Sequence, residues 1–219
     1  MEFDFQAIAD SHQLVLSGLT WTLTMVFGSL ALGVPIGLAA CFAKLMMRGP
    51  INWIAIGYIE FYRTIPEMVN IFWIYFCLPL IFDVRFSSVA SGLLALSLFS
   101  GAFLAEIFRA GIQAVPAGQI EAAYANGMPR RWIWAAIILP QATKLMIPAF
   151  ISFFTDLVKV SGLLSAIGVG ELIYQATVIS NQTWKHFEMF TLVGVIYIAI
   201  ITPLSLAAQH LEARYARNR

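Results

Sequence analysis

The chain has 219 residues, of which 60% are hydrophobic and only 11% are charged. Soluble domains carry about 25% charged residues, so a soluble globule of this composition would lack the charge to cover its surface. A formal net charge of +1 is also too small for a nucleic-acid binder. Composition therefore excludes a soluble enzyme, a disordered tail and a nucleic-acid-binding protein. Cys41 and Cys77 sit in apolar runs, and they indicate neither a disulfide framework nor a metal cluster.

Long apolar runs recur along the chain, and a membrane-spanning helix needs about 20 such residues. Five candidate spans cover residues 13–43, 64–82, 86–105, 135–158 and 189–209. The second contains Glu67, and the fourth contains Lys144 and Asp156. Residues 1–11 hold no Lys or Arg and the first run is too long for a secretory signal, so we expect it to be retained. The sequence predicts an all-α, polytopic membrane protein with about five transmembrane helices in one domain, residues 1–219.

Basic residues predict the orientation, because Lys and Arg accumulate in short cytoplasmic loops. The segment 210–219 is basic and predicts a cytoplasmic C-terminus, whereas the acidic first ten residues predict an N-terminus outside. The residues behind these two predictions are Arg214, Arg217 and Arg219 for the first, and Glu2, Asp4 and Asp10 for the second. An odd number of spans places the two ends on opposite sides. The predicted inner loops contain Lys44, Arg48, Arg109, Arg130 and Arg131, and the outer loops contain only Arg85 and Lys185.

Two shorter features bear on helix packing. Gly33 and Gly37 form a small-xxx-small pair in the first span, which lets helix backbones approach closely. Residues 161–170 are rich in Ser and Gly, with apolar residues between them. Non-helical backbone at membrane depth survives only where it lines a cavity or is buried in protein. We therefore expect a break or a short re-entrant piece near the outer side, although a simple outward turn is the alternative.

The loop 109–134 is long and reads RAGIQAVPAGQIEAAYANGMPRRWIW. Pro116 and Gly118 interrupt the helix that extends from the third span. Residues 119–124 are good helix formers, Gly127 can end that helix in the left-handed conformation, and Pro129 follows. The pattern predicts a short helix held outside the lipid on the cytoplasmic side. Its small side chains suit insertion into a groove of another protein.

Several segments of the chain resemble ABC importer permeases. Glu121-Ala122-Ala123, Gly127 and Ile138-Leu139-Pro140 resemble the family's EAA motif, EAA…G…I-LP. The stretches FYRTIP at 61–66, AEIFRAGI at 105–112, LPQA at 139–142 and GVGEL at 168–172 resemble the polar amino-acid uptake branch. The resemblance covers nearly the whole chain, in order and at the family's spacing.

The resemblance implies a type I importer permease of the bacterial inner membrane, with residues 109–134 as a coupling loop. Such a permease forms half of a homodimer or heterodimer, and ABC ATPase subunits dock on the Glu121 helix. A periplasmic or lipid-anchored binding protein delivers a polar amino acid from outside. The chain has no G-x-x-x-x-G-K-[ST] motif, so ATP and Mg are expected on the separate ATPase. No catalytic, metal or cofactor-binding residue is predicted in this chain.

The docking prediction names six residues on the coupling loop. Glu121 is expected to make an ionic or capping contact with the ATPase, unless it is only a first-turn glutamate favoured by the helix dipole. Ala122 and Ala123 would act by steric fit, and Gly127 would fix the turn that presents the helix. Arg130 and Arg131 would contact the ATPase or lipid phosphates, or would serve only the positive-inside bias.

Charged and polar residues in the spans are the candidates for the solute path. Arg63 and Glu106 are predicted at the same depth, as a gate or a static ion pair that lowers the cost of charge near hydrocarbon. Glu67 and Asn70 share a helix face and could contact solute. Asp156 and Lys159, at i and i+3, also share a face and could address the ammonium and carboxylate of an amino acid. Ser161 completes the predicted path residues.

Three other functions stay open at this point. An ion-gradient-driven secondary transporter of a small polar solute would be expected to show inverted repeats and midplane ionisable residues, and no repeat is visible. An intramembrane enzyme would need catalytic groups, but His12, His186 and His210 lie near predicted membrane ends without a nucleophile or metal partner at helical spacing. A receptor or assembly anchor would not require the long cytoplasmic helix.

Overall fold

The structure, a computed structural model, describes residues 11–216, and side chains as far as residue 213. Helices joined by short connections make up this range, and it contains no strand, which confirms the all-α prediction. The order is α2 (His12–Met46), α3 (Pro50–Thr64), α4 (Glu67–Phe72), the π-helical η1 (Trp73–Cys77), α5 (Leu78–Phe82), α6 (Ser88–Gln113), α7 (Ala117–Ala125), α8 (Arg130–Trp132), the π-helical η2 (Ile133–Ile138), α9 (Leu139–Ser161), the 3-10 helix η3 (Gly162–Ile167), α10 (Leu172–Thr183) and α11 (His186–Ala216).

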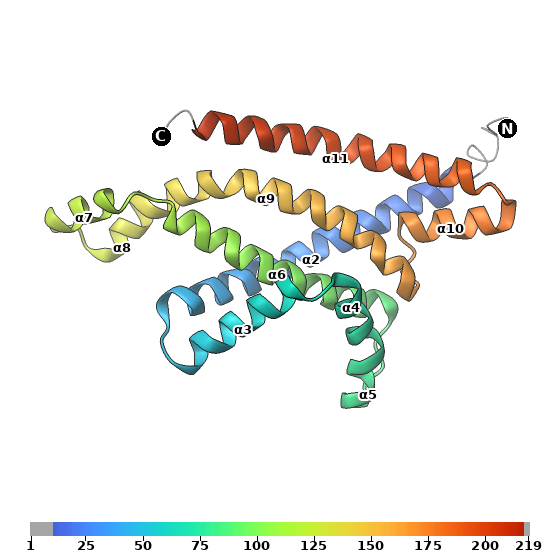
Figure 1. Ribbon diagram of the computed structural model, residues 1–219, viewed down its shortest axis with the longest axis horizontal. Coiled ribbons are helices and arrows are strands. Elements are labelled where there is room, and N and C mark those ends of the chain that lie inside the picture. The colour runs from blue at the N-terminus through green and yellow to red at the C-terminus, as the bar shows by residue number, and fades with distance from the viewer. Residues whose placement is uncertain (1–10, 217–219) are drawn as a thin grey trace.

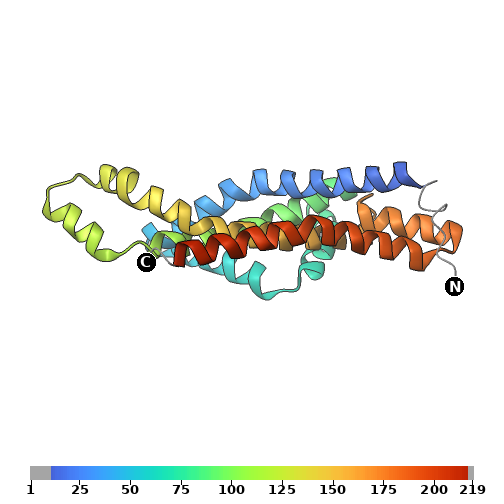
Figure 2. The same ribbon diagram turned by 90° about the horizontal axis from the view of Figure 1, so that it is seen from above.

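The long helices α2, α6, α9 and α11 run lengthwise side by side, as Figures 1 and 2 both show. The α7 and α8 helices project from one end, and α10 packs against the beginning of α2 at the other. Four helical segments are long and apolar enough to cross a membrane: His12–Met46, Ser88–Gln113, Arg130–Ile167 and His186–Ala213. A bent helix pair raises this to five, the predicted number.

The beginning of α2 and the end of α11 lie at opposite ends of the molecule (Figure 1). The orientation prediction also names terminal groups that fall outside the described part of the chain. These are Glu2, Asp4, Asp10, Arg217, Arg219 and the side chain of Arg214.

The second span differs from the candidate span predicted over residues 64–82. The helical run starts at Pro50, and its axis bends by 111° between α3 and α4. Pro66 causes the break, since proline disfavours the helical conformation of the residue before it and lacks an N–H. Ile65 is accordingly extended, with φ −82° and ψ 137°. The α4–η1–α5 arm then leaves the bundle (Figure 1), and apolar side chains such as Leu80 at its tip are largely exposed.

The core is built on the contact between α2 and α6. A Cβ atom on Gly37 would lie 2.9 Å from the carbonyl oxygen of Gly101, and one on Gly33 would lie 2.6 Å from Ser100 Cβ. The predicted small-xxx-small pair therefore lies at a close approach of the two helices. Larger side chains close the remaining space, and Met25, Val26, Leu96, Leu104 and Leu157 are all buried in one cluster.

A buried carboxylate fixes α10 against α2. Glu171 is fully buried, and its side chain accepts hydrogen bonds from the N–H groups of Ile173 (2.9 Å) and Tyr174 (2.8 Å), so it caps α10. The N–H of Leu172 donates to Thr22 Oγ1 on α2 at 3.2 Å. Burial raises the pKa of Glu171 to about 7, against the opposing effect of the two N–H groups. The predicted break over residues 161–170 is present as η3 and the turn at Gly168, whose φ is +81°.

Replacing Gly37 by Ala is expected to lower the stability of the protein by roughly 1–3 kcal/mol, because the added methyl group would press the α6 backbone away from α2. Gly57→Ala is the matched control, since a Cβ on Gly57 meets nothing within 4 Å. That variant should be neutral or slightly stabilising, because Ala is the better helix former. Thermal unfolding in detergent measures the melting temperature of each variant. Equal melting temperatures for the two variants would contradict the close approach at Gly37.

Candidate functional site

The α7 helix is presented by turns on both sides. The chain leaves α6 at Gln113, and α7 begins directly after Pro116. At its other end Gly127 adopts φ +70°, a conformation that favours glycine. The N–H of Gly127 donates to the carbonyl of Tyr124 at 2.9 Å, and that of Met128 to the carbonyl of Ala123 at 3.0 Å. These bonds end the helix, and Figures 1 and 2 show that α7 projects away from the bundle.

The outer surface of α7 carries Glu121 and Ala122, which are both exposed. Glu121 is not in the first turn, so the helix-dipole alternative is wrong. It has no ion pair or hydrogen bond within the described residues, and its carboxylate is available to a partner. The prediction that Ala123 meets the ATPase is wrong. Ala123 is only 6% exposed, and it packs against Val115 and Ile133 inside its own subunit.

One further contact defines the base of this projection. Gln141 Nε2 on α9 donates to Gln119 Oε1 on α7 at 2.6 Å, which ties the two helices together. Arg130 and Arg131 begin the return helix and are exposed. The loop predicted over residues 109–134 is shorter in the structure, because α6 continues to Gln113 and helix resumes at Arg130.

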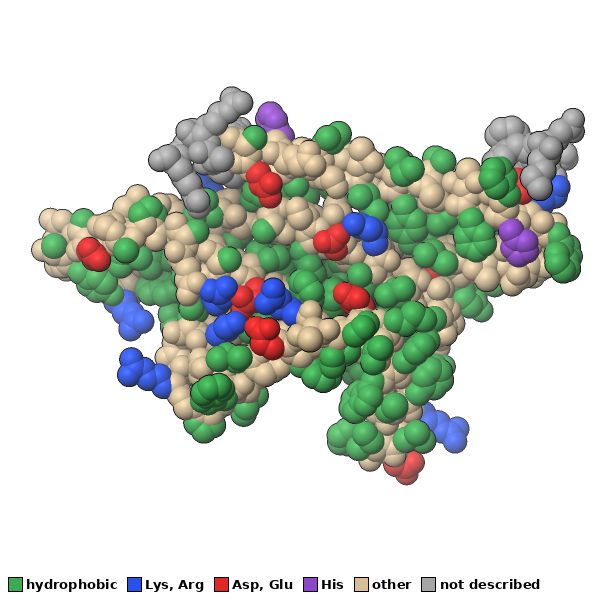
Figure 3. Space-filling view, in the orientation of Figure 1, with side chains coloured by type: hydrophobic (Ala, Val, Ile, Leu, Met, Phe, Trp, Pro, Cys, Tyr) green, Lys and Arg blue, Asp and Glu red, His purple; other side chains and the backbone are tan. Residues whose placement is uncertain are grey.

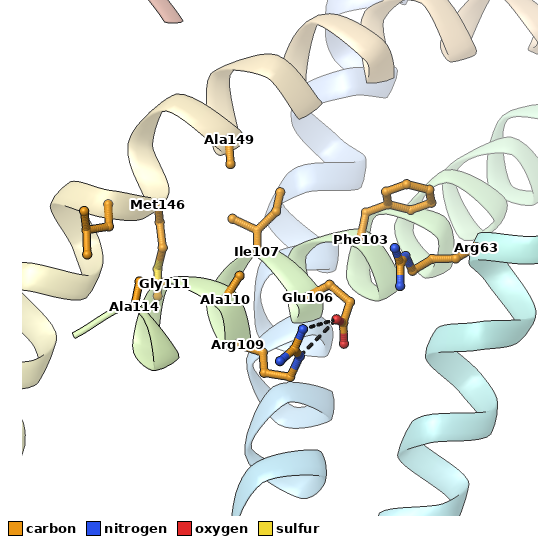
Figure 4. A pocket seen from close by; sticks show the side chains of 11 residues that line it. Arg63, Phe103, Glu106, Ile107, Arg109, Ala110, Gly111, Ala114, Met146 and Ala149 are labelled. Carbon is orange, nitrogen blue, oxygen red and sulfur yellow. Dashed lines mark hydrogen bonds and ion pairs between the residues drawn. The ribbon is translucent and has the colours of Figure 1, made fainter. Parts of the chain in front are cut away.

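Glu106 is the centre of a charge network between α2 and α6. Its Oε1 accepts from Lys44 Nζ at 2.6 Å, and its Oε2 accepts from Arg109 Nε at 2.9 Å and Nη2 at 2.8 Å. The predicted ion pair between Arg63 and Glu106 is therefore wrong. Figure 4 shows the Arg109 guanidinium joined to the Glu106 carboxylate, with no interaction drawn from Arg63 to Glu106.

Arg63 has a different environment at the end of α3. Its Nη1 lies 3.9 Å from Glu60 Oε1, and its guanidinium carbon lies 6.0 Å from the centre of the Phe103 ring. Arg63, Phe103 and Glu106 line one side of a cavity of about 520 Å³ between α6 and α9 (Figure 4). Small-molecule sites typically measure about 300–1,000 Å³, so this cavity has the volume of a ligand site.

One stripe of α9 is exposed and is not apolar. Ala149, Ser152, Asp156 and Lys159 are exposed at helical spacing along it. Lys159 Nζ donates to Asp156 Oδ1 at 2.7 Å, and both side chains are more than half exposed. Exposed charge would be costly against hydrocarbon. The stripe therefore faces water or another protein, whereas exposed residues of α11 such as Ile198 and Leu206 suit lipid.

Figure 3 shows acidic and basic side chains gathered on one face of the molecule, over the region where α3, α6 and α9 meet. Apolar side chains cover the arm formed by α4 and α5 on the same face. This polar patch in an apolar surface is the part of the structure with which a polar solute could interact.

The other residues predicted to line the solute path differ in their burial and in their hydrogen bonds. Glu67 is half-buried in the first turn of α4, next to the bend. Asn70 is 5% exposed, and its Nδ2 has no hydrogen-bond partner in the part of the chain that the structure describes. Ser161 is fully buried, and its Oγ donates to the carbonyl of Val158 at 2.8 Å, so its predicted place in the path is corrected.

Sequence reasoning missed two partners of Glu106. The pairing of Arg109 with Glu106 can be predicted from the sequence, since Arg109 follows Glu106 at i+3 and the two share a helix face. The apolar run of the third span ends at residue 105, which places Arg109 in the predicted loop that follows. Lys44 is 62 residues away in sequence, and only the packing of α2 on α6 brings it to Glu106.

Comparisons with known proteins agree on one family. The family described as binding-protein-dependent transport system inner membrane component matches residues 33–217. A Bacillus subtilis protein named probable glutamine ABC transporter permease protein GlnM is 34% identical and covers 95% of this chain and 96% of its own. The Bacillus subtilis arginine transport system permease protein ArtQ is 31% identical over the full length of both chains.

Two solved structures extend this similarity to three dimensions. An amino acid ABC transporter crystallised with histidines has a chain that is 34% identical, with a TM-score of 0.90. The match covers 98% of this chain and 100% of that one. A chain of the MetNI methionine ABC transporter in an inward-facing conformation has a TM-score of 0.68 at 20% identity, which is a likeness of fold alone.

Proposed function

The chain belongs to the family of binding-protein-dependent transport system inner membrane components, and we propose that it is the permease subunit of an ATP-driven importer of polar amino acids. The observation that carries this proposal is α7, which presents Glu121 and Ala122 to a partner at the end of the bundle. Full-length relatives named as glutamine and arginine permeases support the solute class.

The proposed assembly places α7 in the cytoplasm, where ABC ATPase subunits dock on it and bind ATP and Mg. The side chains that meet the ATPase are Glu121, Ala122, Arg130 and Arg131, while Ala123 and Gly127 hold the helix in place. A second permease subunit, identical or homologous, completes the membrane path. A periplasmic or lipid-anchored binding protein delivers solute at the opposite end, near α10. The N-terminus then lies outside the bacterial inner membrane, and the C-terminus lies inside.

The proposed solute path follows the exposed stripe of α9. Asp156 and Lys159 present opposite charges side by side, which matches the ammonium and carboxylate of an amino acid. Glu67 and the unpartnered amide of Asn70 lie on α4, the other element with polar groups of the predicted path. Net transport requires two states with different affinity for solute. ATP binding would supply that change by moving α7, which the Gln119–Gln141 hydrogen bond and the Ala123 contacts join to α9.

Glu121→Lys is expected to reduce the ATPase retained on the purified permease by roughly tenfold or more, since charge reversal at a docking contact is strongly unfavourable. The fold should be unaffected because Glu121 is exposed and unpaired. Glu212→Lys reverses an exposed charge on α11 and is the matched control. Co-purification in mild detergent gives the measurement. Full retention by Glu121→Lys, or solute uptake by this chain alone in an ion gradient, would refute the docking proposal.

Asp156→Asn is expected to weaken solute uptake about tenfold and to change the order of preference among amino acids, because it removes one charge-assisted contact. Uptake by the reconstituted complex, with binding protein and ATP, is measured against a panel of amino acids. Glu212→Gln, a charge removal outside the path, controls for a general loss of charge. If Asp156→Asn changes neither the rate nor the preference, the path does not pass Asp156.

A further inference from the structure

The cavity between α6 and α9 has a charged end and an apolar wall. Arg63, Phe103, Glu106 and Arg109 form the charged end (Figure 4). The wall consists of Ile107 and Ala110 on α6 and Leu145, Met146 and Ala149 on α9. Ala149 also belongs to the exposed stripe of α9 that contains Asp156 and Lys159. The cavity is therefore continuous with the proposed solute path, on the side towards α7.

The charged groups at this end differ in how many of their polar atoms already have a partner. Both oxygens of Glu106 are occupied, one by Lys44 and the other by Arg109. Arg63 makes no hydrogen bond within the described residues, and its contact with Glu60 is 3.9 Å long. A guanidinium offers five N–H donors in a planar fork that matches a carboxylate. Arg63 is thus the group at the cavity whose donors are free to receive an anion.

The net charge around the cavity limits the class of ligand that can bind there. Three cations, Lys44, Arg63 and Arg109, face two carboxylates, Glu60 and Glu106, so the cluster has a net charge of 3 − 2 = +1. An extra positive charge on a ligand side chain would be repelled by this net positive cluster. The small and apolar wall can hold the uncharged part of a side chain. Glu106 lines the cavity, but both of its oxygens are occupied, so it offers no contact to a second ligand cation.

We propose that this cavity is a second solute station, which binds the α-carboxylate of an amino acid on Arg63 and excludes basic amino acids. The inference rests on the proposed function and adds to it a binding site and a substrate class. Solute released from Asp156 and Lys159 would pass Ser152 and Ala149 and then dock its carboxylate on Arg63. Its side chain would lie against α6 and α9, while its ammonium group stays in water.

A cysteine in the cavity tests the station directly. The full-length chain with Cys41→Ala, Cys77→Ser and Ala110→Cys is placed in phosphatidylcholine nanodiscs, and alkylation by a water-soluble maleimide is timed. The probes are glutamine, asparagine, serine, glutamate and aspartate, with arginine and lysine as the excluded class. The amine 4-aminobutanamide, which is glutamine without its carboxylate, tests the contact with Arg63. Gly118→Cys on α7 is the control, since it is exposed and outside the cavity.

At least one neutral or acidic amino acid should slow alkylation of Ala110→Cys, while arginine, lysine and the amine should not. Arg63→Gln should raise the half-protecting concentration about tenfold or more, because a charge-assisted contact is lost. Arg63→Lys should be intermediate, which separates loss of the cation from misfolding. Alkylation of Gly118→Cys should be the same under all conditions.

Several results would overturn the station. These are the absence of protection by every amino acid, equal protection by the amine, or protection that Arg63→Gln leaves unchanged. Nanodiscs containing phosphatidylglycerol address a lipid source of the anion, and protection by this lipid alone would assign the cavity to a headgroup. The assay contains no ATPase, so its failure is separate from that of the proposed function. ATP-driven uptake without protection removes only the station, and protection without such uptake removes only the importer.

Discussion

Hydrocarbon does not tolerate an unpaired charge, and this constraint organises the whole surface of the protein. Large apolar side chains are exposed along the middle of α11, where Ile198 and Leu206 are more than half exposed. Where α3, α6 and α9 meet, charges are exposed instead, and most have a partner of opposite sign. Glu106 is neutralised by Lys44 and Arg109, and Asp156 by Lys159. One face of the bundle is therefore built for lipid and another for water or protein.

The α9 helix, which carries part of this polar face, also connects it to the projecting α7. Helical structure runs from Arg130 to Ser161 through α8, η2 and α9, and the base of this rod is bound to α7 by the Gln119–Gln141 hydrogen bond. Ala123 adds an apolar anchor at the same place. A displacement of α7 by a docked ATPase would therefore move the α9 stripe directly. The buried Glu171 cap, at the opposite end, keeps α10 fixed on α2, so the two ends of the bundle are held by separate contacts.

Much of the fold could be predicted, because hydropathy and turn residues are local signals. The apolar runs located the spans, and Pro116, Gly127 and Pro129 located α7. Pro66 indicates that the helix is interrupted there, but the 111° angle of the bend depends on the surrounding packing. The candidate site was less predictable. Sequence gives the depth of Arg63 and Glu106 but not the direction in which each side chain points. In the same way, the burial of Ala123 and Ser161 depends on neighbouring helices far away in sequence.

The most direct test of the water-facing α9 stripe is labelling of single cysteines with a membrane-impermeant thiol reagent in the reconstituted complex. Ser152→Cys, in a background of Cys41→Ala and Cys77→Ser, lies between Ala149 and Asp156 on the stripe. Ile198→Cys on α11 is the matched exposed position on the apolar surface. Modification of Ser152→Cys, together with an unreactive Ile198→Cys, is the predicted result. An unreactive Ser152→Cys in both the nucleotide-free and the ATP-bound complex would contradict a water-filled path along α9.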